Sequence, residues 1–278
     1  SIAGVDRAAA ILVCYRRVAR AAMAAPHRMA TARRRTLVTT QLEFSCYADV
    51  EKAMLELVQH HFFEGRFLKT LCSGGYREDQ LRHFALQYGY YSRHFPRVLG
   101  AAIAAMPPID AWWVPIADNL WDEAGRGEPG RAHEKLYLTF LRTVAPDAKL
   151  DEHGIPHVPM SKAVETAIET FIQFFRQATP LKAMAAVGLG SELFAGQVMA
   201  RIGEGFRHPH YQRRGAVNTL FWEVHADEHE PRHYQLCKQI LETFTSPRDL
   251  ADMYETGRYI ALSEARMYEE LHDEMMSL

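Results

Sequence analysis

Apolar residues recur with helical spacing along almost the whole chain from about residue 42. In residues 41–68, QLEFSCYADVEKAMLELVQHHFFEGRFL, the apolar positions follow a period near 3.6 residues and no stretch alternates with period two. Residues 72–75 contain two glycines and predict a turn. The next helix is expected over about residues 76–105, because Pro107 and Pro108 cannot continue it.

The same pattern predicts further helices through the rest of the chain. They are expected over about residues 110–124, 133–143, 161–178, 181–202, 216–244 and 246–276. Ser161 and Ser246 are suited to cap two of these helices, the second with Pro247 at the first helical position. Seven or eight helices, no strand and no internal repeat indicate an all-α bundle.

The N-terminal segment differs in composition from the body of the chain. Residues 1–40 contain eight Arg, no Lys and one acidic residue, Asp6, so their charge is +7 and the remainder carries −9. A disordered arm, an added helix and a transit-like segment all fit this composition. We expect an N-terminal extension over residues 1–40, disordered or loosely helical and without catalytic residues, followed by one helical domain over residues 41–278.

Composition narrows the class of protein. The 278 residues, 48% hydrophobic and 24% charged, fit one globular domain or at most two. An acidic body is not typical of a nucleic-acid binder, and the apolar run at residues 8–14 is too short to span a membrane. The four scattered Cys indicate reduced thiols and a cytoplasmic location. With 14 His, imidazole and carboxylate are the expected metal ligands.

The first candidate site lies in NLWDEAGRGEPGRAHEKLY, residues 119–137. Glu123 ends one predicted helix and His133 begins the next, and the residues between them include three Gly and a Pro. If this piece loops out, the two side chains reach the spacing of the Glu-x-x-His pairs that bind metal in helical bundles. The alternative is a solvated loop with a surface Glu and a surface His.

The second candidate is Glu192, in GLGSELFAG. It is the only charged residue between Lys182 and Arg201, and its neighbours are small or apolar. A carboxylate buried in such a helix must be paired or bind a metal, since its desolvation is costly. A structural Glu that pairs with an Arg, or a neutral hydrogen-bonded Glu, is the alternative.

The third candidate is the histidine series of FWEVHADEHEPRHYQL, residues 221–236. His225, His229 and His233 are four residues apart and form one stripe on a helix. Pro231 weakens this prediction because it removes a backbone hydrogen bond and can kink the helix. A solvated His and Glu surface is the alternative.

Three helices that each offer inward oxygen or nitrogen donors would build an iron or manganese centre in the core of a bundle. Such ligands with open coordination positions suit O2 activation at non-haem iron. Zinc remains possible on ligand type alone.

The sequence resembles a known superfamily over about residues 50–275. HHFFEGRFLKTLCSGGYREDQLRHFALQYGYYSRHFPRVLGAAIA is similar to the first two core helices of the haem-oxygenase-like superfamily. NLWDEAGRGEPGRAHEKLY is similar to the Glu and His segment of its di-metal oxidase and oxygenase branch. The resemblance implies a seven-helix haem-oxygenase-like bundle, usually dimeric, that binds iron and oxidises amino-acid-derived or fatty-acid-like small molecules with O2.

Carried over by position, the resemblance implies Glu123, His133, Glu192 and His225 as ligands of Fe(II), with one or two iron ions per chain. The last ligand helix of the branch usually reads His-x-x-x-Asp-x-x-His, whereas this chain has His229 at the Asp position and Arg232 at the second His, with His233 one residue later. Arg93 falls near the position of a further carboxylate of the branch. His229 and His233 are therefore expected as unusual additional ligands, and His229 also as an acid or base.

We expect a non-haem iron oxidase or oxygenase that is a homodimer and binds neither nucleic acid nor membrane. Its substrate pocket is expected to be aromatic, with Tyr88, Tyr91, Trp121 and Trp222 as candidates. One alternative is a metal-free enzyme of the same fold, of the TenA or PqqC type, either a thiaminase-like hydrolase that needs a Cys nucleophile or a cofactor-maturation oxidase. Cys237 is not convincingly placed for that role. The other alternative is a non-catalytic binding protein with a decayed metal site.

Overall fold

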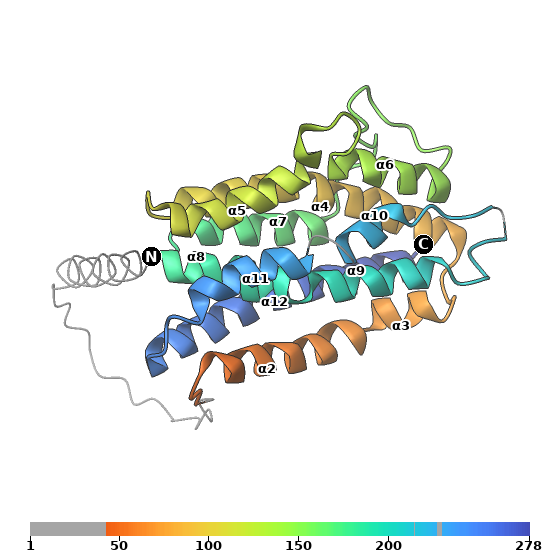
Figure 1. Ribbon diagram of the computed structural model, residues 1–278. Coiled ribbons are helices and arrows are strands. Elements are labelled where there is room, and N and C mark those ends of the chain that lie inside the picture. Colours follow the sequence, from red (N-terminus) through yellow and green to blue (C-terminus); the bar gives the residue numbers. More distant parts are fainter. Residues whose placement is uncertain (1–42, 214, 227–229) are drawn as a thin grey trace, which may run out of the picture. The chain divides into compact units, whose positions relative to one another are not determined.

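The computed structural model describes residues 43–213, 215–226 and 230–278, and these residues form a bundle of helices (Figure 1). The extension expected over residues 1–40 lies outside the described residues, as does His229. Within the described part, the only β pairing is a single bridge between Leu150 and Pro156. The prediction of an all-α fold is confirmed.

The first half of the bundle contains five α-helices. They are α2 (Tyr47–Val58), α3 (Arg66–Cys72), α4 (Glu78–Ala105), α5 (Asp110–Glu123) and α6 (His133–Val144). A π-helical turn, η1 (Gln59–Phe63), follows α2, and a 3-10 turn, η2 (Gly125–Gly127), follows α5. The apolar pattern indicated continuous helix where the structure has α2, η1 and α3. The π turn keeps the chain helical and leaves little trace in the pattern, whereas extended backbone at Gly65 separates η1 from α3.

The second half contains α7 (Lys162–Phe175), α8 (Pro180–Val187), the π turn η3 (Gly188–Glu192) and α9 (Leu193–Phe206), then α10 (Leu220–Val224), α11 (Glu230–Leu241) and α12 (Pro247–Met276). The two predicted serine caps are confirmed: the hydroxyls of Ser161 and Ser246 accept from the backbone N–H groups of Val164 and Asp249. The helix expected over residues 216–244 instead contains the two shorter helices α10 and α11.

The long helix α12 packs against many other elements of the bundle. It contacts α2, α3, α4, α7, α8 and η3, while α4 also packs on α5 and α6. Side chains from α4, α6, α9 and α10 meet in an aromatic cluster in the core, and its members include Phe84, Tyr88, Phe140, Phe206 and Trp222. This cluster fixes the position of α10 against α4 and α9.

The stretch Pro180–Phe206 is long and apolar enough to qualify as a membrane span by length and composition. Its most apolar window is, however, 72% buried inside the bundle, which is typical of a core helix.

Close packing explains the small residues of Pro180–Phe206. A Cβ atom on Gly188 would lie 2.8 Å from Cβ of Cys237, and one on Gly190 would lie 2.8 Å from Cβ of Ile260.

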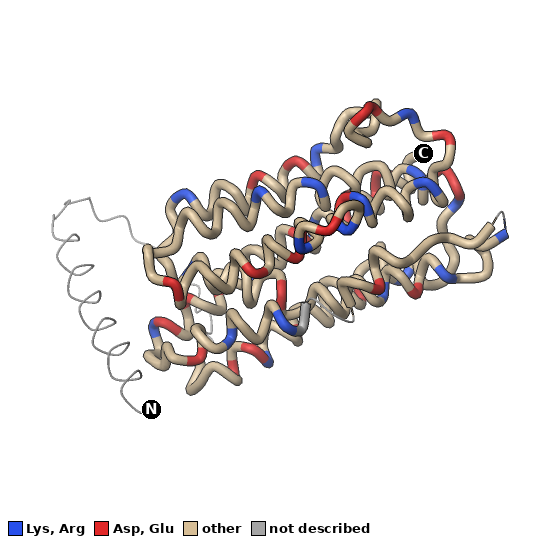
Figure 2. Tube along the Cα trace, turned by 45° about the horizontal axis from the view of Figure 1, so that its top comes forward, with Lys and Arg blue, Asp and Glu red and all other residues tan. Residues whose placement is uncertain are grey.

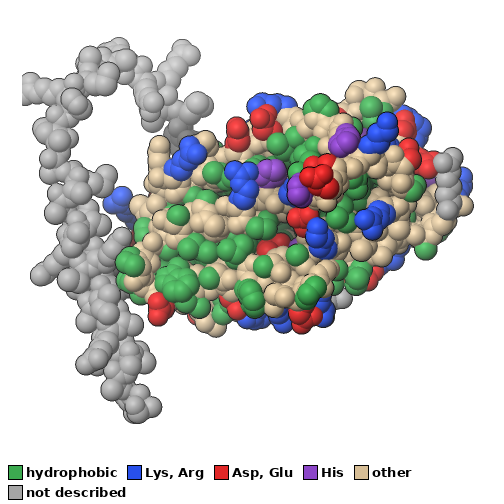
Figure 3. All heavy atoms as spheres, turned by 90° about the horizontal axis from the view of Figure 1, so that it is seen from above, with side chains coloured by type: hydrophobic (Ala, Val, Ile, Leu, Met, Phe, Trp, Pro, Cys, Tyr) green, Lys and Arg blue, Asp and Glu red, His purple; other side chains and the backbone are tan. Residues whose placement is uncertain are grey.

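Charged residues of both signs are interspersed along the helices of the described part (Figure 2). On the face shown in Figure 3, acidic, basic and histidine side chains lie beside one another, and the described residues of that face form no continuous basic patch.

Candidate metal centre and pocket

The loop between α5 and α6 brings Glu123 and His133 together. Glu123 is the last residue of α5 and His133 is the first residue of α6. Between them the backbone adopts positive φ at Gly125, Arg126, Gly127 and Gly130. As a result, Glu123 Oε1 lies 2.9 Å from His133 Nδ1. The predicted looping-out of this segment is confirmed, and it places the two side chains together.

Glycine is required at position 125 because the chain folds back on itself there. Its φ is 69°, and a Cβ atom would lie 2.3 Å from the backbone nitrogen of Ala132. Both facts exclude a side chain without a shift of the backbone. At Gly130 the φ is 81° but nothing lies within 4 Å of an added Cβ, so only the conformation favours glycine.

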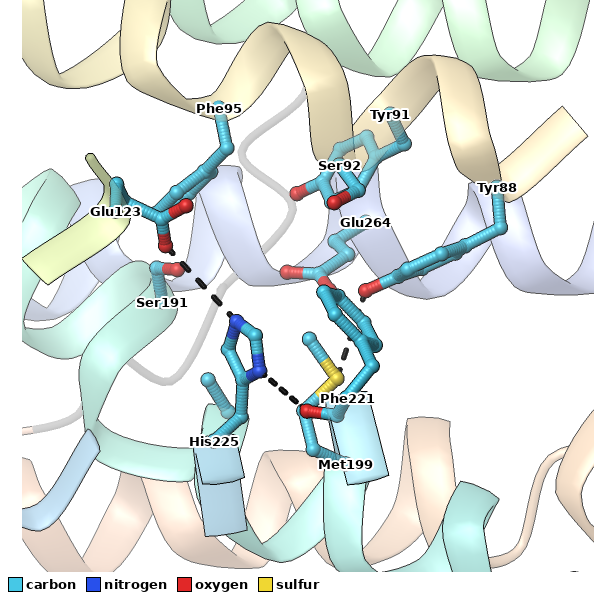
Figure 4. A pocket seen from close by; sticks show the side chains of 11 residues that line it. Tyr88, Tyr91, Ser92, Phe95, Glu123, Ser191, Met199, Phe221, His225 and Glu264 are labelled. Carbon is cyan, nitrogen blue, oxygen red and sulfur yellow. Dashed lines mark hydrogen bonds and ion pairs between the residues drawn. The ribbon is translucent and has the colours of Figure 1, made fainter. Parts of the chain in front are cut away.

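His225 joins Glu123 and His133 from the end of α10. Its Nδ1 lies 2.7 Å from the carbonyl oxygen of Phe221 and must donate, since a carbonyl only accepts. In the neutral ring this leaves the lone pair on Nε2, which lies 3.9 Å from Glu123 Oε1 (Figure 4). The rings of His133 and His225 are 4.3 Å apart between centroids.

These three side chains form a donor set that fits a divalent metal ion. Glu123, His133 and His225 are exposed by 7%, 3% and 4%, and their ligand atoms all lie within 4.8 Å of one another. Two imidazoles and one carboxylate are the ligands of many non-haem iron(II) sites. A backbone carbonyl that fixes the tautomer of a ligand histidine is also common in such sites.

Glu192 lies in a separate group with His233. The π turn η3 ends at Glu192, which is 2% exposed. Its Oε1 accepts a hydrogen bond of 2.8 Å from Asn119 Nδ2, and its Oε2 lies 3.6 Å from His233 Nδ1. The structure therefore brings two predicted ligands together here, outside the set of Glu123, His133 and His225.

Asp122 forms a hydrogen bond with the second ring nitrogen of His233. His233 Nε2 donates to Asp122 Oδ2 over 2.9 Å, and Arg126 and Arg232 contact the same carboxylate at 2.6 and 3.0 Å. Burial lowers the pKa of His233, but the hydrogen bonds and charges of Glu192 and Asp122 outweigh it, so that pKa is raised.

Asp118 stands beside this second group. Asp118, Asp122 and His233 also have ligand atoms within 4.8 Å of one another. Arg232, however, pairs with Asp118 at 2.6 Å and with Asp122, so guanidinium groups already compensate these carboxylates. Asp122 and Asn119 were not predicted as site residues, although both lie in the same motif as Glu123.

A cavity borders Glu123 and His225 and encloses about 420 Å³ of space, part of it open to solvent (Figure 4). The lining residues are Tyr88, Tyr91, Ser92, Phe95, Glu123, Ser191, Ala195, Met199, Phe221, His225 and Glu264. Of the four residues expected in the pocket, Tyr88 and Tyr91 line it. Trp222 is fully buried and packs against Tyr88 with ring centroids 5.1 Å apart, so it does not line the cavity.

Trp121 does not reach the cavity either. It lies on the outer face of α5, is 54% exposed, and is close enough that a Cβ on Gly127 would lie 2.9 Å from its ring. Helical spacing explains this position, because Trp121 and Glu123 are two residues apart and therefore point to different sides of the helix.

Glu264 is a buried carboxyl group that lines the cavity from α12 and was not predicted from the sequence. Its side chain lies between Tyr88 and Tyr91 (Figure 4). Burial and then repulsion from Glu192 raise its pKa to about 8, while the nearby hydroxyls of Tyr268 and Tyr91 oppose the shift. In the sequence Glu264 is one of many acidic residues in a long helix, so periodicity did not distinguish it.

Cys237 is 2% exposed and packs against Gly188. Burial, followed by the charge of Glu192, raises the pKa of its thiol well above the ordinary value. The thiolate, which is the nucleophilic form, is therefore disfavoured at neutral pH. This environment is typical of a structural cysteine.

Comparison with known proteins agrees with this architecture. A family model described as "iron-containing redox enzyme" matches residues 82–263. No curated protein matches the chain.

Three solved structures show the same fold. One is a CADD-like protein of unknown function from Nostoc punctiforme, with a TM-score of 0.65 and 14% identity, covering 82% of this chain and 97% of that chain. Another is a domain of unknown function with a heme oxygenase-like fold from Shewanella denitrificans, at 0.63 and 13%, covering 82% and 93%. A TenA homolog from Pseudomonas syringae has 0.61 and 12%, covering 89% and 99%. The haem-oxygenase-like fold predicted from the resemblance is confirmed.

Proposed function

Because this chain belongs to the family of iron-containing redox enzymes, we propose that it is a non-haem iron oxidase or oxygenase that uses O2 to oxidise a small molecule in the cavity. The observation that supports this proposal most directly is the buried meeting of Glu123, His133 and His225 at the wall of that cavity. A substrate in the cavity would lie directly beside the donor set.

Glu123, His133 and His225 would hold the first iron ion. Iron bound there supplies the redox chemistry that allows a spin-paired organic molecule to react with O2. Glu192 and His233 are the described residues that would contribute to a second metal position, so the proposal includes one or two iron ions per chain.

The protein's own contribution is to orient these groups and to exclude water. The Phe221 carbonyl holds the His225 ring with Nε2 toward Glu123, and Asn119 holds one oxygen of Glu192. Asp122 holds His233 with Nδ1 toward Glu192. Tyr88, Tyr91, Phe95 and Phe221 would place aromatic surface around a substrate and limit the access of bulk water to the reacting atoms.

The fold alone does not separate this proposal from a metal-free enzyme, since TenA homologues share it. Two features of the side chains support the iron-dependent reaction. The nucleophile required by the hydrolase alternative is absent at Cys237, whose buried thiol stays protonated. A carboxylate and two histidines are also buried close together. Burial of these groups is costly unless they are paired or bind a metal, so a binding protein that had lost its metal would not be expected to retain all three.

Anaerobic reconstitution with Fe(II) tests the proposal. We expect the desalted wild-type protein to retain at least one iron per chain and to consume O2, and a chelator to abolish both. The variant His225→Ala is expected to lose iron and O2 consumption, whereas His60→Ala, which changes an exposed histidine paired with Glu64, keeps both. Wild-type protein that retains no iron, or activity that survives the chelator, would contradict the proposal.

A further inference from the structure

The acidic and imidazole groups of the cavity have no basic side chain beside them in its lining. Among the described lining residues the carboxyl and imidazole groups are Glu123, His225 and Glu264, and none of the lining residues is Lys or Arg. Glu123 and His225 belong to the proposed iron site. Glu264 is therefore a carboxyl group of the cavity that the proposed metal chemistry does not use.

We propose that Glu264 binds the ammonium group of the substrate, so that the cavity selects a small amine with an apolar body. This inference rests on the proposed function, which it deepens by naming the substrate class. Glu264 is placed for the role because its carboxyl group enters the cavity from α12, whereas Glu123 comes from α5 and His225 from the end of α10 (Figure 4).

The described surroundings of Glu264 favour its protonated form while the cavity is empty, because burial and the charge of Glu192 raise its pKa to about 8. It is 8% exposed, and no ion pair joins it to a basic residue within the described part of the chain. Its neighbours are the hydroxyls of Tyr91 and Tyr268 and the charge of Glu192, which repels it. A buried carboxylate without a compensating positive charge is unfavourable, and an ammonium group in the cavity would allow Glu264 to release its proton and bind in the ionised form.

An anionic substrate is disfavoured by the same groups. A fatty-acid or other carboxylate head beside Glu264 would add a negative charge to a region that already holds Glu123 and Glu192. The described lining offers no guanidinium or ammonium group to receive it. Like charges in a poorly solvated space repel strongly, so acids should be excluded.

The remaining walls suit the apolar part of such an amine. Tyr88, Phe95 and Phe221 present aromatic rings and Met199 a flexible thioether. Aromatic faces attract a neighbouring cation as well as an apolar chain. An arylalkylamine or alkylamine therefore matches both parts of the cavity.

Binding of three matched probes to the full chain, freed of metal by a chelator, tests this inference. Phenethylamine, 2-phenylethanol and phenylacetate have similar bodies and carry a positive, a neutral and a negative head. We expect isothermal titration at neutral pH to show phenethylamine binding at least about tenfold tighter than the alcohol, and no binding of phenylacetate at millimolar concentration.

Two variants assign the preference to Glu264. Glu264→Gln is expected to weaken phenethylamine binding about tenfold while the alcohol binds as before, and Glu270→Gln, an exposed acid on the same helix, is expected to behave as wild type. The inference is overturned if phenylacetate or the alcohol binds as tightly as the amine, if no amine binds, or if Glu264→Gln keeps the preference. The comparison of the three probes on the wild-type protein tests the inference even if the Glu264→Gln variant fails to fold.

The test is independent of iron, so the two proposals can fail separately. Iron loading and O2 consumption without amine binding would overturn only the substrate class. Amine binding to a protein that retains no iron would overturn the oxidase proposal and leave the amine site standing.

Discussion

Glu123 Oε1 and His133 Nδ1 lie 2.9 Å apart, although residues 124–132 leave the helical path between them. The loop lets two separate helix ends, those of α5 and α6, meet with their side chains on the same side. A continuous helix would place residues 123 and 133 nearly three turns apart, about 15 Å along its axis. The backbone of the loop is therefore part of the candidate metal centre.

The two loop glycines with different surroundings test this role. Gly125→Ala should push the loop away from Ala132 and weaken Fe(II) binding by about tenfold or more, because small displacements of ligand groups are costly. Gly130→Ala should keep Fe(II) affinity and lose only about 1 kcal/mol of stability, the cost of positive φ in a residue with a side chain. Anaerobic titration and urea unfolding measure the two effects. Equal Fe(II) affinity in both variants would show that the loop does not position the ligands.

A second prediction concerns which acidic group binds the metal. Glu123→Gln should reduce iron content to near zero, since it removes the carboxylate shared by His133 and His225. Asp118→Asn should leave the iron content unchanged, because Arg232 already compensates Asp118. Metal analysis after anaerobic reconstitution and desalting decides between the two groups. Iron lost from the Asp118 variant but kept in the Glu123 variant would contradict this prediction and place the metal beside Asp118, Asp122 and His233.

The sequence predicted the features that depend on local rules. The helices, the serine caps at Ser161 and Ser246 and the Gly-rich break after Glu123 follow from spacing, hydrogen-bonding capacity and backbone freedom. The isolation of Glu192 among apolar residues also correctly indicated burial.

Features that depend on distant parts of the chain could not be predicted in this way. The role of Asp122 depends on Arg126, Arg232 and His233, two of which are more than 100 residues away. Glu264 lies in an amphipathic helix in which acidic residues usually face solvent, and only the packing of α12 in the bundle places it beside the cavity. Trp121 was misplaced because an aromatic residue near a candidate ligand need not share its helix face.

The buried carboxyl group of Glu264 predicts how stability changes with pH. Between the ordinary pKa of 4.5 and the folded value of about 8, the folded protein keeps a proton that the unfolded chain releases. Stability should therefore fall as pH rises across this window, by up to about 1.4 kcal/mol per pH unit. Glu264→Gln should remove this slope and be more stable than wild type at the upper end. Urea unfolding of the metal-free proteins measures it, and identical slopes would contradict the assignment.

Asp122 predicts a second pH dependence, through His233. Asp122 and Glu192 raise the pKa of His233 in the folded protein, so this histidine stabilises the fold below its ordinary pKa of 6.5, and that contribution is lost as pH rises through the raised value. Asp122→Asn removes one of the two causes and leaves Arg126 and Arg232 without their shared partner. We expect it to cost about 1–3 kcal/mol at about pH 6 and less at about pH 9.

The exposed carboxylate of Asp79, which pairs with Arg77, supplies the control for this variant. Asp79→Asn should cost little, and its cost should not vary over the same pH range, because no buried histidine depends on it. Urea unfolding of the metal-free proteins at the two pH values gives the comparison. If the Asp122 variant loses the same free energy at both pH values, the carboxylate does not control the protonation of His233, and its contacts serve only to hold α5 against α11.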